Sequence, residues 1–139
     1  MSENKSSEQR PAGAGPSWGI DGISWVDANV LIDDISPMMA PTAQARPAVL
    51  AGKRQFFTGS GATIGIWEGG PGEVIIESYP VDELWRILEG SVILSDATGH
   101  SHAFQAGDTF VLHKGFTGAA RMPTKMRKLY ASLATIREK

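Results

Sequence analysis

Short runs of β-favouring residues alternate with glycine-based turns along the chain from residue 54 onward. No apolar repeat of the helical period continues there for more than about two turns. Short strands with turn signals every ~8–12 residues are typical of a β-sandwich or barrel. The pattern predicts strands in nine segments: 54–59, 62–69, 72–79, 83–90, 91–96, 102–107, 108–115, 116–122 and 126–136.

Glycines mark the expected connections between these strands. The segments 69–72 and 96–99 have the composition of hairpin loops. Gly90 lies where the chain is expected to turn so tightly that a side chain would clash. These signals support a barrel of antiparallel strands.

The alternation within strands indicates which side chains share a face, because residues two apart point the same way. Two groups are expected to do so: Glu73, Ile75, Glu77 and Tyr79 in one run, and Glu83, Trp85 and Ile87 in the next. In the last run Leu129 alternates with Lys128 and Tyr130. A carboxylate-bearing face on each of two adjacent strands is the pattern from which the candidate site is built.

The N-terminal part of the chain has a different composition. Residues 1–17 are rich in Ser, Glu, Gly, Ala and Pro and have no large apolar residue after Met1, so we expect a disordered tail. Residues 18–50 are mixed and contain prolines that argue against a long helix. We expect an arm over 18–50 that packs on a barrel over 51–139, because 139 residues suit one domain.

Charge and cysteine content exclude several function classes. The net charge is −2 and there is no cysteine, so disulfides, thiolate metal sites and a cysteine nucleophile are excluded. We expect neither nucleic acid nor membrane as a partner, and a cytoplasmic location, since no apolar run approaches the ~20 residues that span a bilayer. The basic cluster of Arg121, Lys125, Arg127 and Lys128 is expected to be a solvated strand face.

Two spaced motifs resemble those of cupins, whose first motif is G-x5-H-x-H-x3,4-E-x6-G and whose second is G-x5-P-x-G-x2-H-x3-N. Glu83 and Gly90 match the end of the first motif, and Gly107 with His113-Lys114-Gly115 matches the start of the second, with His113 in the proline position. The string ESYPVDELWRILEG…AGDTFVLHKGFTG…MRKLY is similar to the ureidoglycine aminohydrolase-type cupin domain, over about 51–132. The resemblance implies an all-β, double-stranded β-helix (jelly-roll, RmlC-like) barrel.

The resemblance also implies a metal site, of which this sequence keeps little. Cupin metals are held by three histidines and one glutamate, which suit Mn, Fe, Ni or Zn. The family's ligand positions fall here on Glu77 and Tyr79, or on Ile76 and Ser78 with the longer spacing, then on Glu83 and Gly118. The metal-binding members of the resembled branch have Glu-x-His, a histidine at the Glu83 position and a glutamine at the Gly118 position. Only Glu77 matches that set. The side chains of this sequence that could still coordinate a metal are Glu77, Glu83 and His113.

Glu77 and Glu83 are expected to face one enclosed space. Without a metal, their mutual repulsion would raise at least one carboxyl pKa, which suits either an acid/base pair or a site for a cationic ligand. Hydrogen bonding within the barrel is the plain alternative. The expected ligand-binding set is Glu77, Tyr79, Glu83, Trp85 and His113. His100 and His102 are expected in an exposed hairpin.

Three functions remain open from the sequence. The first is a barrel that binds a small polar or amine-bearing molecule through those five residues. The second is an enzyme of the aminohydrolase or isomerase kind, with Glu77 or Glu83 as the base and a divalent metal or His113 as its partner. The third is a non-catalytic dimerisation scaffold, and by resemblance we expect a homodimer in any of the three cases.

Overall fold

The computed structural model describes residues 21–38, 43–46 and 49–133. The described residues form strands and no helix, so they contain no helix that could span a bilayer. The strands are β1 (Ser36–Pro37), β2 (Ala43–Arg46), β3 (Leu50–Gly59), β4 (Ala62–Gly69), β5 (Gly72–Ile76), β6 (Asp82–Glu89), β7 (Ser91–Asp96), β8 (Ser101–Gln105), β9 (Thr109–Leu112), β10 (Gly118–Met122) and β11 (Met126–Leu133).

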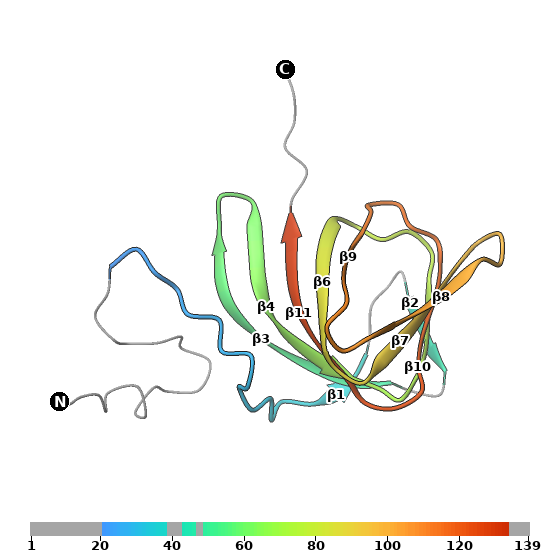
Figure 1. Ribbon diagram of the computed structural model, residues 1–139, viewed down its shortest axis with the longest axis horizontal. Coiled ribbons are helices and arrows are strands. Elements are labelled where there is room, and N and C mark those ends of the chain that lie inside the picture. Colours follow the sequence, from blue (N-terminus) through green and yellow to red (C-terminus); the bar gives the residue numbers. More distant parts are fainter. Residues whose placement is uncertain (1–20, 39–42, 47–48, 134–139) are drawn as a thin grey trace, which may run out of the picture.

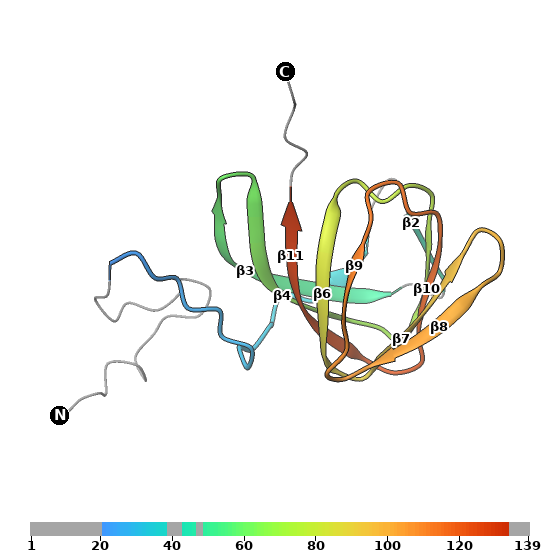
Figure 2. The same ribbon diagram turned by 45° about the horizontal axis from the view of Figure 1, so that its top comes forward.

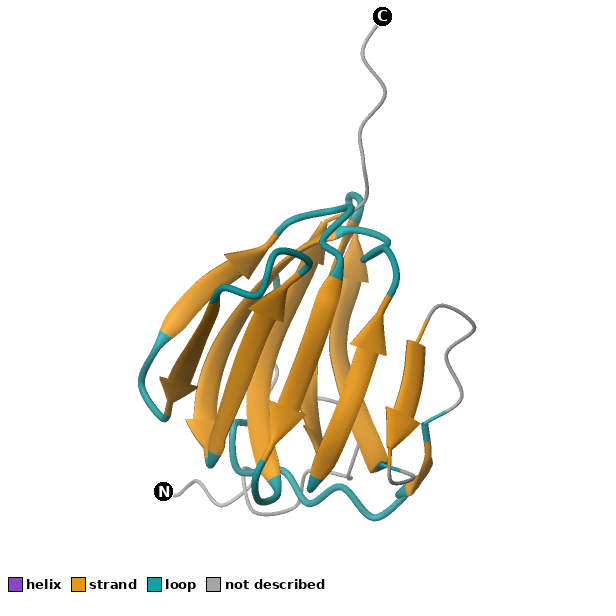
Figure 3. Cartoon of the chain, turned by 90° about the vertical axis from the view of Figure 1, so that its right-hand side faces the viewer, coloured by secondary structure: helices purple, strands orange, loops and turns teal. Residues whose placement is uncertain are grey.

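Two antiparallel sheets face each other and form the barrel (Figures 1 and 2). The first has the strand order β1-β3-β4-β11-β6-β9, and the second has the order β2-β5-β10-β7-β8. Figure 3 shows the strands of the barrel seen from the side, joined by short loops at both ends. This double-sheet arrangement confirms the expected jelly roll.

The main hydrophobic core lies between the two sheets. Its buried members include Ile76 of β5, Ile87 of β6, Val92 of β7 and Met126 of β11. Across the first sheet, register places Lys128 beside Trp67 and Ile87, and Tyr130 beside Gly65 and Trp85. Two polar residues of β11 therefore point into the barrel with the core.

A second cluster covers the outer face of the six-stranded sheet. Val30 and Ile32 of the N-terminal arm bury Ile66 of β4 there, with Leu129 packed alongside. Arg127 ties the arm to the sheet: its guanidinium donates hydrogen bonds to the carbonyls of Ala28 and Val30 and to Glu68. Leu129 and Arg127 thus face outward, and their neighbours in β11 face inward.

The turn signals had different outcomes. The 96–99 segment joins β7 to its neighbour β8 as a hairpin, as expected. The 69–72 segment is not a hairpin, because β4 and β5 belong to different sheets and the chain crosses between them. The expectation for Gly90 is confirmed: its φ is +77°, and a Cβ there would overlap the carbonyl oxygen of Lys125. The expected tail at 1–17 lies outside the described residues.

Candidate functional site

Glu83 is the carboxylate inside the barrel. It begins the buried face of β6, on which Trp85 and Ile87 follow at intervals of two, as the alternation predicts. Its Oε1 accepts hydrogen bonds from the Tyr79 hydroxyl at 2.5 Å and from Trp85 Nε1 at 2.6 Å. Oε2 makes no hydrogen bond to any described residue, so one carboxylate oxygen remains open to a ligand.

Lys128 is the cation that faces Glu83. Its Nζ lies 4.0 Å from Glu83 Oε1, and only 7% of its side chain is exposed. The same atom lies 3.1 Å from the Trp85 ring centroid and 4.8 Å from that of Trp67. A carboxylate and two aromatic faces all stabilise the charged form of an amine, and this explains how a lysine is tolerated inside the barrel.

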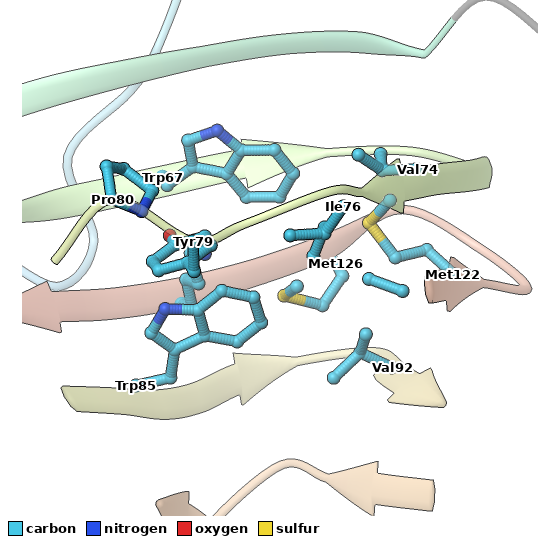
Figure 4. Close-up of a pocket in the computed structure, with 11 residues that line it drawn as sticks. Trp67, Val74, Ile76, Tyr79, Pro80, Trp85, Val92, Met122 and Met126 are labelled. Carbon is cyan, nitrogen blue, oxygen red and sulfur yellow. The ribbon is translucent and has the colours of Figure 1, made fainter. Parts of the chain in front are cut away.

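Two cavities meet at Lys128. One has a volume of about 240 Å³ and mostly apolar walls (Figure 4). Figure 4 shows its aromatic end, formed by Trp67, Tyr79, Pro80 and Trp85, and its aliphatic end, formed by Val74, Ile76, Val92, Met122 and Met126. The other measures about 200 Å³ and is more polar, lined by Lys53, Trp67, Tyr79, Glu83, Lys128 and Tyr130. Lys128 therefore lies on a wall common to an apolar and a polar space.

Tyr130 contributes an unpaired hydroxyl to the polar cavity. The residue is 5% exposed, and its hydroxyl has no hydrogen-bond partner in the part of the chain that the structure describes. Gly65, opposite it on β4, makes room for the phenol. A buried donor without a partner is unfavourable by about 1–3 kcal/mol, and such a group can be satisfied by a ligand.

Burial changes the proton affinities of these groups. It lowers the pKa of Lys128 from 10.5 to about 7, and the Glu83 carboxylate opposes that change. Burial also raises the pKa of Tyr79 and of Tyr130, and the charge of Glu83 adds to both shifts. Near neutral pH the two phenols therefore stay protonated as donors, and Lys128 is present both as the ammonium ion and as the free amine.

Glu77 does not join Glu83 in an enclosed space, so the expected carboxylate pair does not form. β5 ends at Ile76, and its buried positions are Val74 and Ile76, which leaves Glu77 exposed just beyond the strand. Glu77 continues the face of Glu73 and Ile75, which is opposite to the buried one, and the alternation breaks only after it. Backbone hydrogen bonds between Tyr79 and the turn at Gly115 and Phe116 then turn Tyr79 into the cavity. The structure thus brings Tyr79, Glu83 and Trp85 together, without Glu77.

His113 lines neither of the two cavities that meet at Lys128. It is exposed and borders a separate open hollow of about 390 Å³ that Phe104, Phe110, His100 and His102 also line. The reason is local: β9 ends at Leu112, whose side chain takes the buried position, and His113 follows in a turn. The exposed positions expected for His100 and His102 are confirmed.

The residues present do not fit a cupin metal. No group of three or more His, Cys, Asp or Glu side chains suited to a metal occurs among the described residues. Glu83 is the one expected ligand that lines the cavities, and the Lys128 ammonium beside it repels a divalent cation. At Gly118 a Cβ would overlap the Ser95 carbonyl oxygen, so no histidine or glutamine fits that ligand position without a backbone shift.

Sequence reasoning missed Lys128 and Tyr130. The expectation that the basic cluster forms a solvated strand face is wrong for Lys128 and for Arg127, whose side chains are largely buried. The signal that could have found it was the alternation in β11, where Lys128 and Tyr130 share a face with Met126. The two tryptophans and the glutamate that accept a lysine inside the barrel come from β4 and β6, which no local pattern reveals.

The comparisons with known proteins agree with the fold. A protein of unknown function from Pseudomonas syringae pv. tomato str. DC3000, of the DUF861 family, is 29% identical with a TM-score of 0.71. That match covers 80% of this chain and 48% of that one, so the chain spans about half the length of that relative. No curated protein matches the sequence significantly.

Two EutQ proteins share the fold. The putative ethanolamine utilization protein Q of Salmonella typhimurium LT2 is 22% identical with a TM-score of 0.55, over 66% of this chain and 73% of that one. The Clostridium difficile EutQ protein is 16% identical with a TM-score of 0.57, over 63% and 71%. The family model of the EutQ-like cupin domain matches residues 58–130, more than half of the sequence. The narrower ureidoglycine aminohydrolase type stays a prediction, and the chain belongs to the EutQ-like cupin domain family.

Proposed function

We propose that this cupin barrel binds a small molecule with an apolar body and an oxygen-bearing head group, either a carboxylate or a carbonyl. The observation that carries the proposal is the position of Lys128 on the wall shared by the apolar and the polar cavity. The volume of about 240 Å³ is below the ~300–1,000 Å³ of sites for drug-sized ligands. The ligand is therefore small.

The charges of the site favour an oxygen-bearing head group over an amine. Lys128 already provides the cation beside Glu83, and Lys53 lines the same polar cavity. Lys128, the Tyr130 hydroxyl and Lys53 are all donors, which suits an acceptor oxygen. The amine-bearing ligand expected from the sequence would be repelled by Lys128 and would have to share Glu83 with it.

A thermal-shift screen of the full chain tests this proposal. The panel contains short-chain carboxylates, aldehydes, 2-oxo acids and amines of matched size. We expect the melting temperature to rise with members of the oxygen-bearing classes, and the rise to shrink in Lys128→Met. A rise with amines alone, or none with any class, would show the proposal to be wrong.

A second function is not favoured by the site. The metal-dependent enzyme lacks a ligand set among the described residues. The dimerisation scaffold does not account for the unpaired Tyr130 hydroxyl at the polar cavity. The homodimer itself stays a prediction, which sedimentation equilibrium would test.

A further inference from the structure

We propose that the Lys128 amine forms an imine with a small carbonyl compound, an aldehyde or a 2-oxo acid, held in the apolar cavity. The inference rests on the proposed function, which supplies a bound ligand with an oxygen-bearing head group. It goes further by assigning a covalent step to one atom, Lys128 Nζ. Three features of the site support it: the burial of the amine, the shape of the cavity beside it, and the proton-handling groups around it.

The first feature is the environment of the amine. A lysine attacks a carbonyl only as the free base, and removal from water favours that form. Lys128 is almost fully enclosed, and burial lowers its pKa to about 7. An exposed lysine with an ordinary pKa is almost entirely protonated at pH 7. Lys128 therefore offers far more of the reactive form than a surface lysine does.

The second feature is the space in front of the amine. The apolar cavity holds aliphatic side chains at one end and Trp67, Tyr79 and Trp85 at the other (Figure 4). Lys128 lies at the aromatic end, because its Nζ contacts the rings of Trp67 and Trp85. Pro80 at the aromatic end is exposed, so this end is the nearer to solvent. A carbonyl compound with an alkyl chain would bury that chain among Val74, Ile76 and Met122. Its carbonyl carbon would then lie at the lysine end.

The third feature is a set of groups that can handle protons. The Tyr130 hydroxyl is available to donate to the carbonyl oxygen, because it has no partner among the described residues. Burial keeps this phenol protonated. Glu83, 4.0 Å from Nζ and with Oε2 free of hydrogen bonds to described residues, can take a proton from the attacking amine. The donor and the acceptor both line the polar cavity, which meets the apolar cavity at Lys128.

The reaction balances without an oxidant or a reductant. The Nζ lone pair forms a C–N bond as the carbonyl π bond opens, and Glu83 relays one amine proton to the oxygen. The resulting carbinolamine then loses the second amine hydrogen and its hydroxyl as water, which leaves a C=N bond. The chain changes by the mass of the carbonyl compound less one water.

Reductive trapping tests the inference on the full-length protein. The protein is incubated at pH 7 with butanal or 2-oxobutyrate and sodium cyanoborohydride, and the modified lysines are located by peptide mapping. Each trapped lysine gains the mass of the probe less one oxygen. We expect Lys128 to be labelled on the order of a thousandfold faster than a lysine of ordinary pKa, from its larger share of free amine at pH 7. Its labelling rate should level off above a pH of about 7, and that of exposed lysines should keep rising.

Variants separate the step from simple binding. Lys128→Met should abolish the fast label, and Tyr130→Phe should slow it. Lys125→Met, at an exposed lysine that lines neither cavity, should leave it unchanged. Peptide mapping of the wild-type protein tests the inference even if a variant fails to fold. Label spread over exposed lysines with Lys128 untouched would overturn the imine. If the same probes raise the melting temperature without labelling Lys128, the proposed ligand binding stands and the imine is wrong. If the probes neither bind nor label, and no other member of the panel binds, the ligand binding and the imine are both wrong.

Discussion

Gly65 and Tyr130 lie opposite each other on β4 and β11, and the glycine leaves the space that the phenol fills. A Cβ at position 65 would come within 2.6 Å of the Tyr130 hydroxyl oxygen and would also overlap the Arg54 carbonyl oxygen. The position of the Tyr130 hydroxyl in the polar cavity therefore depends on a glycine in the neighbouring strand β4.

We predict that Gly65→Ala destabilises the protein by about 1–3 kcal/mol, the usual effect of overpacking a core. The backbone oxygen of Arg54 cannot move aside as a side chain could, so relaxation is limited. Urea unfolding followed by tryptophan fluorescence measures the change. Gly59→Ala is the matched strand control, because its nearest neighbour is the exposed ring of Phe57 at 3.2 Å. Equal effects of the two substitutions would contradict the packing argument.

The two tyrosines of the site should respond differently to loss of the hydroxyl. Tyr79→Phe removes a 2.5 Å hydrogen bond to the Glu83 carboxylate and should lower the free energy of unfolding by about 1.5–3 kcal/mol. Tyr130→Phe removes a hydroxyl with no partner among the described residues, so it should not lower the free energy of unfolding and should raise it by up to about 1–3 kcal/mol. Denaturant midpoints of both variants test the contrast, and a larger loss in Tyr130→Phe would show that its hydroxyl is bonded in solution.

The stability of the protein should rise as the pH increases from 7 to 9. The pKa of Lys128 is about 7 in the folded protein, against the ordinary lysine value of 10.5 that applies to the unfolded chain. Below pH 7 both states hold the proton, so the full penalty for a buried ammonium is present. Between the two values the unfolded chain binds more protons, and the free energy of unfolding increases with pH. The rise from pH 7 to 9 is at most about 2–3 kcal/mol, and the aromatic contacts of Lys128 reduce it.

Urea unfolding at pH 6.5, 7.5 and 9 measures this dependence, with Lys128→Met as the reference. The variant lacks the buried amine, so its stability should change less over the same range. Parallel curves for the two proteins would mean that Lys128 keeps an ordinary pKa. The window stops at pH 9 because the raised pKa values of Tyr79 and Tyr130 act in the opposite direction once unfolded tyrosines ionise, near pH 10.

Arg127 should hold the N-terminal arm on the outer face of the sheet. Arg127→Met removes the hydrogen bonds to the Ala28 and Val30 carbonyls and the 2.6 Å ion pair with Glu68. We expect a loss of about 3 kcal/mol, the scale for breaking a largely buried ion pair, and faster amide exchange over 26–32. Arg121→Met is the control, because Arg121 is exposed on β10, and it should change stability by less than about 0.5 kcal/mol. Unchanged exchange in the arm would contradict the anchoring role.

Much of the barrel could be predicted because its signals are local. The turn at Gly90, the hairpin at 96–99 and the shared face of Glu83, Trp85 and Ile87 each depend on a few consecutive residues. The alternation of side chains along β6 also predicted that Glu83 points into the barrel. Alternation did not show which face of β5 is buried: Val74 and Ile76 point into the core, so Glu77 lies on the opposite face, with Glu73 and Ile75.

Three features follow from the residues alone: an all-β chain of the cupin type, an inward glutamate on β6, and the lack of the histidines that cupin metals need. The neighbours of that glutamate follow only from the pairing of the strands. Lys128 belongs to a basic run that looks solvated, and it is buried because β4 and β6 bring Trp67, Trp85 and Glu83 around its amine. The free energy of a charge depends on neighbours that are distant along the chain, so this part of the site appears only once the strands are paired.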